Sequence, residues 1–215
     1  MELQTEFQRM RNWFLYGVLL AALVVFGGCA STGSGSGGGC GFALSGTAGD
    51  FEVTVACIKN IAIGILTADC APILFYDPNK KIIGCAHVGW KGALNGIIKN
   101  TTKKFNDLNS NNNDLIAVIG PCINKKNYEV KIDFFKKFIN QDKKNENFFE
   151  KISDTQYNFD LRGFINKELF NLGIKKIENI EMDTFLKKEL FYSFRRSRLN
   201  KEQDFGRCIS VILMT

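Results

Sequence analysis

Two short stretches, TADCAP at residues 67–72 and AHVGWKG at residues 86–92, decide how this chain is interpreted. They contain Cys70 and His87, and His87 is the only histidine among the 215 residues. A cysteine and a histidine placed at the ends of neighbouring strands can share one metal ion. The first question is therefore whether the surrounding sequence brings these two residues together.

Three apolar runs surround the two stretches, at residues 61–66, 73–76 and 82–87, and each has the length of a buried strand. The sequence DPNK at residues 77–80 is a turn signal between the second and third runs. If this turn closes a hairpin, the 17 residues that separate Cys70 from His87 become a short distance in space. Thiolate and imidazole both suit zinc. The spacing indicates a zinc site, and the open alternative is a buried free cysteine beside an isolated core histidine.

Four segments from residue 56 onward resemble the successive signatures of the laccase-domain family, once called multicopper polyphenol oxidases. They are TADCAPILF, GCAHVGWKGALNGII, IGPCI followed by YEV, and FYSFRR with a downstream Gly-Arg pair. Members of this family are described as zinc-dependent purine nucleoside phosphorylases with adenosine deaminase activity, and some are called peptidoglycan editing factors. The resemblance implies such an enzyme, with the N-terminal part of the family's fold missing or replaced.

The resemblance also implies which residues hold the metal. The family uses His, Cys and His, of which the cysteine matches Cys70 and the second histidine matches His87, while the first histidine has no counterpart here. A catalytic zinc normally has three protein ligands. Asp69, Cys85 and Cys122 are the candidates for the third ligand. Asp69 is disfavoured because neighbours on a strand point to opposite faces, and Cys122 in the loop-like GPCI sequence is better placed. The expected cofactor is zinc, with copper as the alternative metal.

Three basic residues are candidates for binding phosphate. Arg195 and Arg196 follow the apolar sequence FYSF, which we predict to be a rigid strand that directs their guanidinium groups at an anion. The alternative is that they tie carboxylates together inside the protein. The sequence GWKG at residues 89–92 predicts a glycine-rich turn into a helix, where backbone N–H groups can hold phosphate beside Lys91.

The N-terminal region differs in composition from the rest. We predict a lipoprotein-like leader and Gly/Ser-rich linker at residues 1–49 and a laccase-like domain at residues 50–215. Cys29 is the candidate for lipidation, and the apolar stretch before it is too short to favour a membrane span. The leader belongs either to a genuine exported fragment or to an unrelated sequence joined to a truncated enzyme. We expect a cytoplasmic protein by family resemblance, or a membrane-anchored lipoprotein if residues 1–29 act as a signal.

The remaining pattern alternates helices and strands and predicts an α/β fold, a single layered domain with a mixed sheet that is truncated at its N-terminus. Helices are expected at residues 92–105, at 132–139 and between Asp160 and Gly173, and further strands at 115–119, 174–180 and 208–213. The net charge is +6, but the lysines are dispersed, so we expect no nucleic-acid partner.

The leading hypothesis is a zinc-dependent enzyme that binds a purine nucleoside and phosphate. A second hypothesis makes Cys70 a nucleophile and His87 its base in an amidase that edits peptidoglycan precursors. The third hypothesis is a degenerate fragment that keeps the core and does not catalyse a reaction.

Overall fold

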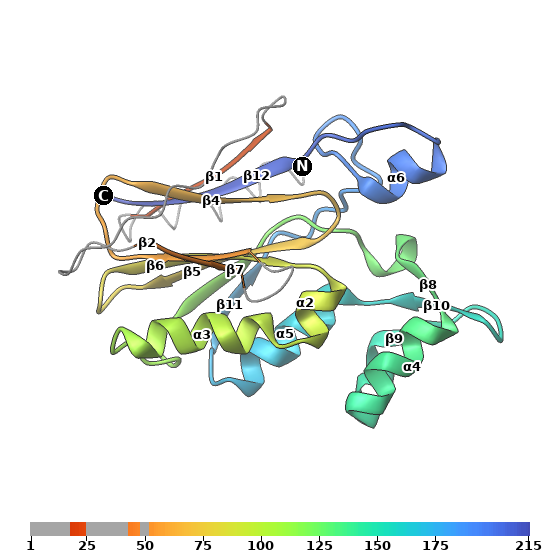
Figure 1. Ribbon diagram of the computed structural model, residues 1–215, viewed down its shortest axis with the longest axis horizontal. Coiled ribbons are helices and arrows are strands. Elements are labelled where there is room, and N and C mark those ends of the chain that lie inside the picture. The colour runs from red at the N-terminus through yellow and green to blue at the C-terminus, as the bar shows by residue number, and fades with distance from the viewer. Residues whose placement is uncertain (1–17, 25–42, 48–51) are drawn as a thin grey trace.

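The computed structural model describes residues 18–24, 43–47 and 52–215 (Figure 1). A mixed sheet of six strands lies at its centre, and its strands are, from one edge to the other, β11 (Lys176–Asn179), β7 (Ile116–Ile119), β5 (Ala71–Asp77), β6 (Ile82–Val88), β3 (Glu52–Ala56) and β2 (Ala43–Thr47). The β11–β7 pair is parallel, and the other pairs are antiparallel. The α/β fold with a mixed sheet is therefore confirmed.

The central strands are apolar on both sides because the sheet is covered on both faces. A second, antiparallel sheet with the order β1–β12–β4 covers one face, and helices cover the other (Figure 1). The strands of this second sheet are β1 (Val18–Val24), β12 (Cys208–Met214) and β4 (Ala62–Thr67). Alternate residues of β4 are buried, as expected for a strand with one face on the core. Two apolar cores result, one between the sheets and one beneath the helices.

The helices follow the prediction with one correction. Helices α4 (Ile132–Gln141) and α5 (Leu161–Asn171) lie where they were expected, and the Asp160 carboxylate accepts a hydrogen bond of 2.8 Å from the Gly163 N–H at the start of α5. The single helix predicted at residues 92–105 is wrong. The chain forms α2 (Trp90–Leu94) and α3 (Ile97–Asp107) instead, because Gly96 between them adopts a φ of 77° that ends the first helix.

A third, smaller sheet extends one end of the molecule. It has the order β8–β10–β9 and packs with α4 around a cluster of aromatic rings. Its strands are β8 (Glu129–Lys131), β10 (Gln156–Phe159) and β9 (Phe149–Lys151), with 3-10 helices at η1 (Lys125–Asn127) and η2 (Lys143–Phe148). This sheet brings Tyr128 and Glu129 beside the end of the central sheet, where the candidate site lies.

Two described segments of the N-terminal region pair with strands of the large sheets, and the leader and linker stay a prediction. Strand β1 pairs with β12 over its whole length, and β2 pairs with β3. Both are additions at the edge of a sheet, where unpaired backbone groups accept a further strand. Cys29 lies outside the described residues, so its lipidation stays a prediction. None of the helices in the described part of the chain combines the length and apolar character that a membrane crossing needs.

Close packing between the central sheet and α3 depends on the absence of a side chain at Gly84. A Cβ atom at this position would lie 2.7 Å from the ring of Phe105, which is fully buried. We expect Gly84→Ala to lower the free energy of unfolding by about 1–3 kcal/mol, because the ring must move within a packed core. Urea denaturation measures this change. In the double variant with Phe105→Leu, the smaller side chain should relieve the clash, so the two costs should be less than additive; strict additivity would contradict this explanation.

Candidate functional site

The β5–β6 hairpin places Cys70 and His87 on one face of the sheet. Pro72 lies directly opposite His87 in the antiparallel register. Cys70 comes two residues before Pro72, and a Cβ atom at Gly89 would lie 2.8 Å from its sulfur, so the thiol sits against the strand end that follows His87. The predicted hairpin is therefore confirmed, and it makes Cys70 and His87 diagonal neighbours. That they share a metal ion stays a prediction.

The described residues supply no third ligand for a metal. No group of three His, Cys, Asp or Glu side chains that could hold an ion occurs in this part of the chain. Cys85 is fully buried in the core between the two large sheets, and the sulfur of Cys122 accepts a hydrogen bond of 3.2 Å from Arg162. The carboxylate of Asp69 is engaged elsewhere. Two donors are one fewer than a catalytic zinc site uses, so the residues present fit a zinc ion only in part.

Asp69 instead joins three distant segments of the chain. Its carboxylate accepts hydrogen bonds from the Thr184 hydroxyl (2.7 Å), the Ser193 hydroxyl (2.9 Å) and the backbone N–H of Arg195 (2.6 Å). Its carbonyl oxygen accepts a bond of 3.0 Å from the N–H of Ile123. Asp69 is buried and has a φ of 79°, a backbone conformation that non-glycine residues rarely adopt. These contacts fix the loop that carries Cys70 against the segment that carries Arg195.

A pocket of about 570 Å³ opens beside this junction. Its lining joins the Cys70 loop to the small third sheet and to helix α6 (Phe194–Leu199). Four aromatic side chains line it: Trp90, Tyr128, Phe134 and Phe194. Three basic side chains line it as well: Lys131, Arg195 and Arg198. A pocket of this size, mostly apolar and with a few charged groups, is typical of a small-molecule site.

The two predicted arginines have different environments. The predicted strand before them is wrong, because Ser193 caps the N-terminus of α6 by accepting a hydrogen bond of 3.1 Å from the Arg196 N–H. Arg195 lines the pocket and donates from Nη2 to the carbonyl of Glu129 at 2.7 Å. Arg196 donates to three backbone carbonyls of the preceding segment at 2.6–2.9 Å, so its geometry favours an internal strut. The alternative in the sequence analysis, in which the arginines hold internal groups together, therefore fits Arg196, but the groups that it holds are carbonyls and not carboxylates.

Lys91 and His87 are not among the residues that line the pocket. Lys91 is exposed in the first turn of α2, after the predicted glycine turn at Gly89, and its Nζ lies 5.9 Å from the ring centre of Trp90. His87 lies in β6. Among the predicted site residues, the pocket brings together Cys70 and Arg195.

Sequence reasoning missed the aromatic lining and Arg198. The signal for Arg198 was available, because a serine followed by a short apolar and basic segment is a helix N-terminus. Had α6 been predicted as a helix, the three-residue spacing of Arg195 and Arg198 would have placed both on one face. The aromatic residues come from three helices and from the segment before β8, and no local pattern joins them.

Burial raises the pKa of the Cys70 thiol to about 12, with the nearby Asp69 carboxylate and Cys122 adding to the effect. The thiol is therefore protonated at neutral pH in the absence of a metal. A nucleophilic cysteine needs the opposite, a lowered pKa. This environment disfavours the amidase hypothesis.

The chain is similar to known proteins over most of its length. A family model described as multi-copper polyphenol oxidoreductase laccase matches residues 45–215. The chain belongs to this family. A purine nucleoside phosphorylase of Rickettsia conorii is 40% identical over 157 residues, which are 73% of this chain and 65% of that protein. The purine nucleoside phosphorylase YfiH of Escherichia coli is 30% identical over 134 residues, 62% of this chain and 54% of that protein.

Solved structures show the same fold. The crystal structure of the Bacillus licheniformis hypothetical protein YfiH has a TM-score of 0.70 and 30% identity, and the match covers 76% of this chain and 61% of that one. The YlmD structure from Geobacillus stearothermophilus has a TM-score of 0.67 and 25% identity. This chain spans less than two thirds of the length of the relatives named above.

The Asp69 network predicts a large effect of a small change. Asp69→Asn replaces one acceptor oxygen by an NH₂ group, which cannot accept the bonds from Ser193 and Arg195. We expect the free energy of unfolding to fall by about 2–3 kcal/mol, since hydrogen bonds to a buried charged group are lost. Chemical denaturation measures the loss, and Asp107→Asn, at the exposed end of α3, is the control. Equal stability of the two variants would contradict the role given to Asp69.

The raised pKa of Cys70 predicts slow alkylation. With the chain free of metal at pH 8, iodoacetamide should label Cys70 on the order of 50-fold more slowly than glutathione, because the small thiolate fraction outweighs its greater intrinsic nucleophilicity. The rate should rise about tenfold per pH unit between pH 8 and 10, since ionisation is far from complete. Mass spectrometry of the Cys70 peptide gives both rates. Labelling as fast as that of glutathione would instead indicate an activated nucleophile.

Proposed function

We propose that this chain acts as a purine nucleoside phosphorylase, with adenosine deaminase as a second activity and zinc as a weakly held cofactor. The observation that carries the proposal is the pocket, which combines Cys70, four aromatic side chains and Arg195 in one space. The names of the relatives support it, because two of them are called purine nucleoside phosphorylases.

The pocket contains groups suited to bind both the purine base and the phosphate of a nucleoside reaction. A flat purine base can stack on aromatic rings, of which Trp90 and Phe134 are 4.9 Å apart between centres at a tilt of 47°. Arg195 presents a guanidinium group that matches the oxygens of phosphate. In phosphorolysis an oxygen of hydrogen phosphate forms a bond to C1′ of the ribose, while the bond from C1′ to the purine breaks and the base leaves with the proton that the phosphate gives up. Holding the two reactants together in one pocket is what the chain's own residues contribute to this step.

Cys70 and His87 are the residues that would hold zinc. A bound zinc ion would supply hydroxide near neutral pH, as water-dependent deamination requires. Because the described residues provide two donors, we expect the affinity for zinc to be low. The Cys70 thiol, whose pKa is raised, must also release its proton before it can bind the ion, which weakens binding further at neutral pH.

The test is inosine phosphorolysis and adenosine deamination by the full chain with excess zinc, together with the zinc content of the protein. We expect slow turnover that depends on zinc. Cys70→Ser should abolish both zinc binding and deamination, whereas Cys57→Ser, a change at a half-buried cysteine outside the pocket, should preserve them. Arg195→Ala should raise KM for phosphate about tenfold and leave KM for the nucleoside within about twofold, since a charge-assisted contact to phosphate is removed.

Two results would contradict the proposal. Absence of turnover and of zinc binding in the unaltered chain would favour the degenerate fragment. Turnover that survives Cys70→Ser would show that the reaction does not use this residue.

A further inference from the structure

Three of the four aromatic rings that line the pocket carry a cation against the ring. The distances to the ring centres are 5.9 Å for Lys91 and 5.2 Å for Lys137 on Trp90, 5.7 Å for Arg195 on Tyr128 and 4.9 Å for Arg198 on Phe194. The four cations come from three helices, α2, α4 and α6. Arg195 and Arg198 themselves line the pocket, whereas Lys91 and Lys137 lie against a ring, Trp90, that lines it.

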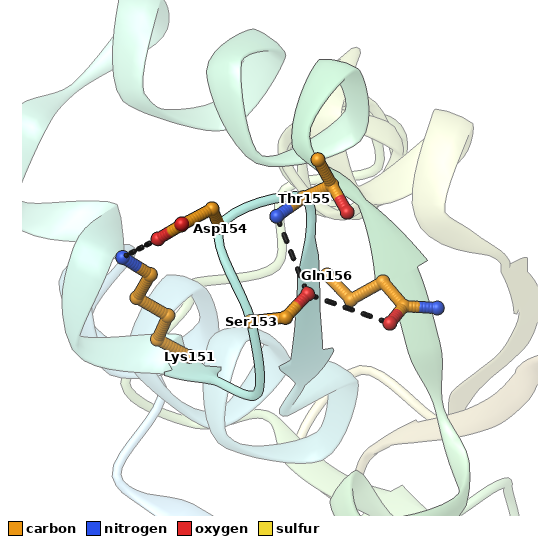
Figure 2. A network of polar contacts seen from close by, with 5 residues as sticks. All are labelled: Lys151, Ser153, Asp154, Thr155 and Gln156. Carbon is orange, nitrogen blue, oxygen red and sulfur yellow. Dashed lines mark hydrogen bonds and ion pairs between the residues drawn. The ribbon is translucent and has the colours of Figure 1, made fainter.

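An aromatic ring holds a cation differently from a carboxylate. In the exposed turn between β9 and β10, Lys151 pairs with Asp154 at 2.8 Å, and the two charges cancel (Figure 2). Lys125 is paired in the same way with Glu150 at 3.0 Å. A ring attracts a cation through its quadrupole and has no net charge. The cations around the pocket are thus positioned while their charge stays available to an anion.

The acidic groups of the pocket do not offset this charge. Asp69 is buried, and its carboxylate accepts three hydrogen bonds from the protein. Glu129 is exposed, and its Oε1 accepts a bond of 2.7 Å from Gln156. Lys131, two residues along β8 from Glu129, adds a further cation to the lining. Three cations, Lys131, Arg195 and Arg198, therefore line a pocket whose lining has one exposed carboxylate.

We propose that the pocket binds a purine nucleoside 5′-diphosphate, which competes with the nucleoside. The inference rests on the proposed function for the placement of the base among the aromatic rings. A neutral nucleoside with one phosphate ion needs a single guanidinium fork, which Arg195 provides. Arg198 and Lys131, which also line the pocket, remain for a second anionic group. A diphosphate attached to the same nucleoside is the ligand that contacts both the rings and these cations.

The experiment compares the binding of adenosine, AMP, ADP and pyrophosphate to the full chain by calorimetry in low salt. We expect affinity to rise from adenosine through AMP to ADP, with ADP binding about tenfold or more tightly than adenosine, because each step adds charge-assisted contacts. The preference for ADP should shrink in high salt, which screens exposed cations. ADP should also displace adenosine.

Two pairs of variants separate the pocket from the general charge of the protein. Arg198→Ala and Lys131→Ala should each weaken ADP binding about three- to tenfold and leave adenosine within about twofold, as expected for single exposed charges. Their matched controls are Arg207→Ala and Lys167→Ala. These two cations lie 4.8 Å from the ring centre of Phe205 and 5.3 Å from that of Phe148, outside the pocket lining, and their loss should leave ADP binding unchanged.

Each other result is decisive. Equal affinity for adenosine and ADP would overturn the nucleotide site and leave the proposed function intact. Pyrophosphate binding as tightly as ADP would overturn it too, because the base would then contribute nothing. ADP binding without adenosine binding would support the nucleotide site and count against a nucleoside as the substrate. Failure of all four ligands to bind would refute both proposals.

Discussion

The carboxylate of Asp69 is the contact on which the candidate site depends. One side chain accepts hydrogen bonds from Thr184, Ser193 and the Arg195 N–H, more than a hundred positions further along the chain. These groups belong to the segment that leads into α6 and to α6 itself. The pocket lies between this helix and the Cys70 loop, so its shape depends on how firmly the two are joined. A buried carboxylate that accepts several hydrogen bonds holds the two segments together strongly, because removing any one donor leaves part of the carboxylate charge without solvation.

Two glycines let the side chains of this loop fit closely against neighbouring strands. A Cβ atom at Gly89 would meet the sulfur of Cys70 at 2.8 Å, and one at Gly120 would meet the ring of Pro72 at 2.7 Å. The N–H of Gly120 also donates to the carbonyl of Pro72 at 2.8 Å. The same loop is therefore anchored by Asp69 on one side and fitted against β6 and β7 on the other. Arg196 adds rigidity to the opposite wall by holding three carbonyls of its own segment.

The parts of the fold that could be predicted from sequence are those with a local signal. The strands around Cys70 and His87 are short apolar runs joined by a turn, and the helix after Asp160 has both its cap and its terminal glycine. Errors arose where a single residue changes the backbone. Gly96 divides a periodic stretch into two helices, and Ser193 begins a helix at a sequence that has the composition of a strand. The apolar segment at β1 was ambiguous, because the same composition suits an export signal and a strand that completes a sheet.

Only the residues of the site that belong to local motifs could be predicted from the sequence. Cys70 and Arg195 each belong to a recognisable motif, but the joint between them depends on pairing across the whole chain. The aromatic rings and the cations on them come from α2, α4, α6 and the segment before β8, which no sequence period connects. The composition shows that the net charge is positive, but it does not show where the basic residues lie in the folded protein. Dispersed along the sequence, several of these basic residues nonetheless gather around one pocket in space.

Binding and catalysis depend on different parts of this site. In the proposed complex the aromatic rings and the cations would contact a base and an anion whether or not a reaction occurs, so they would stabilise the bound ground state and the transition state to a similar extent. Interactions of that kind improve affinity without accelerating the chemical step. A faster chemical step needs groups that act on charge as it develops, and the two residues suited to hold a metal for this purpose are Cys70 and His87. With two donors in the described residues, the position of an ion would be fixed poorly, and a small displacement of a catalytic group is costly in rate. Under the proposed function, the arrangement is therefore better suited to binding a ligand than to fast turnover.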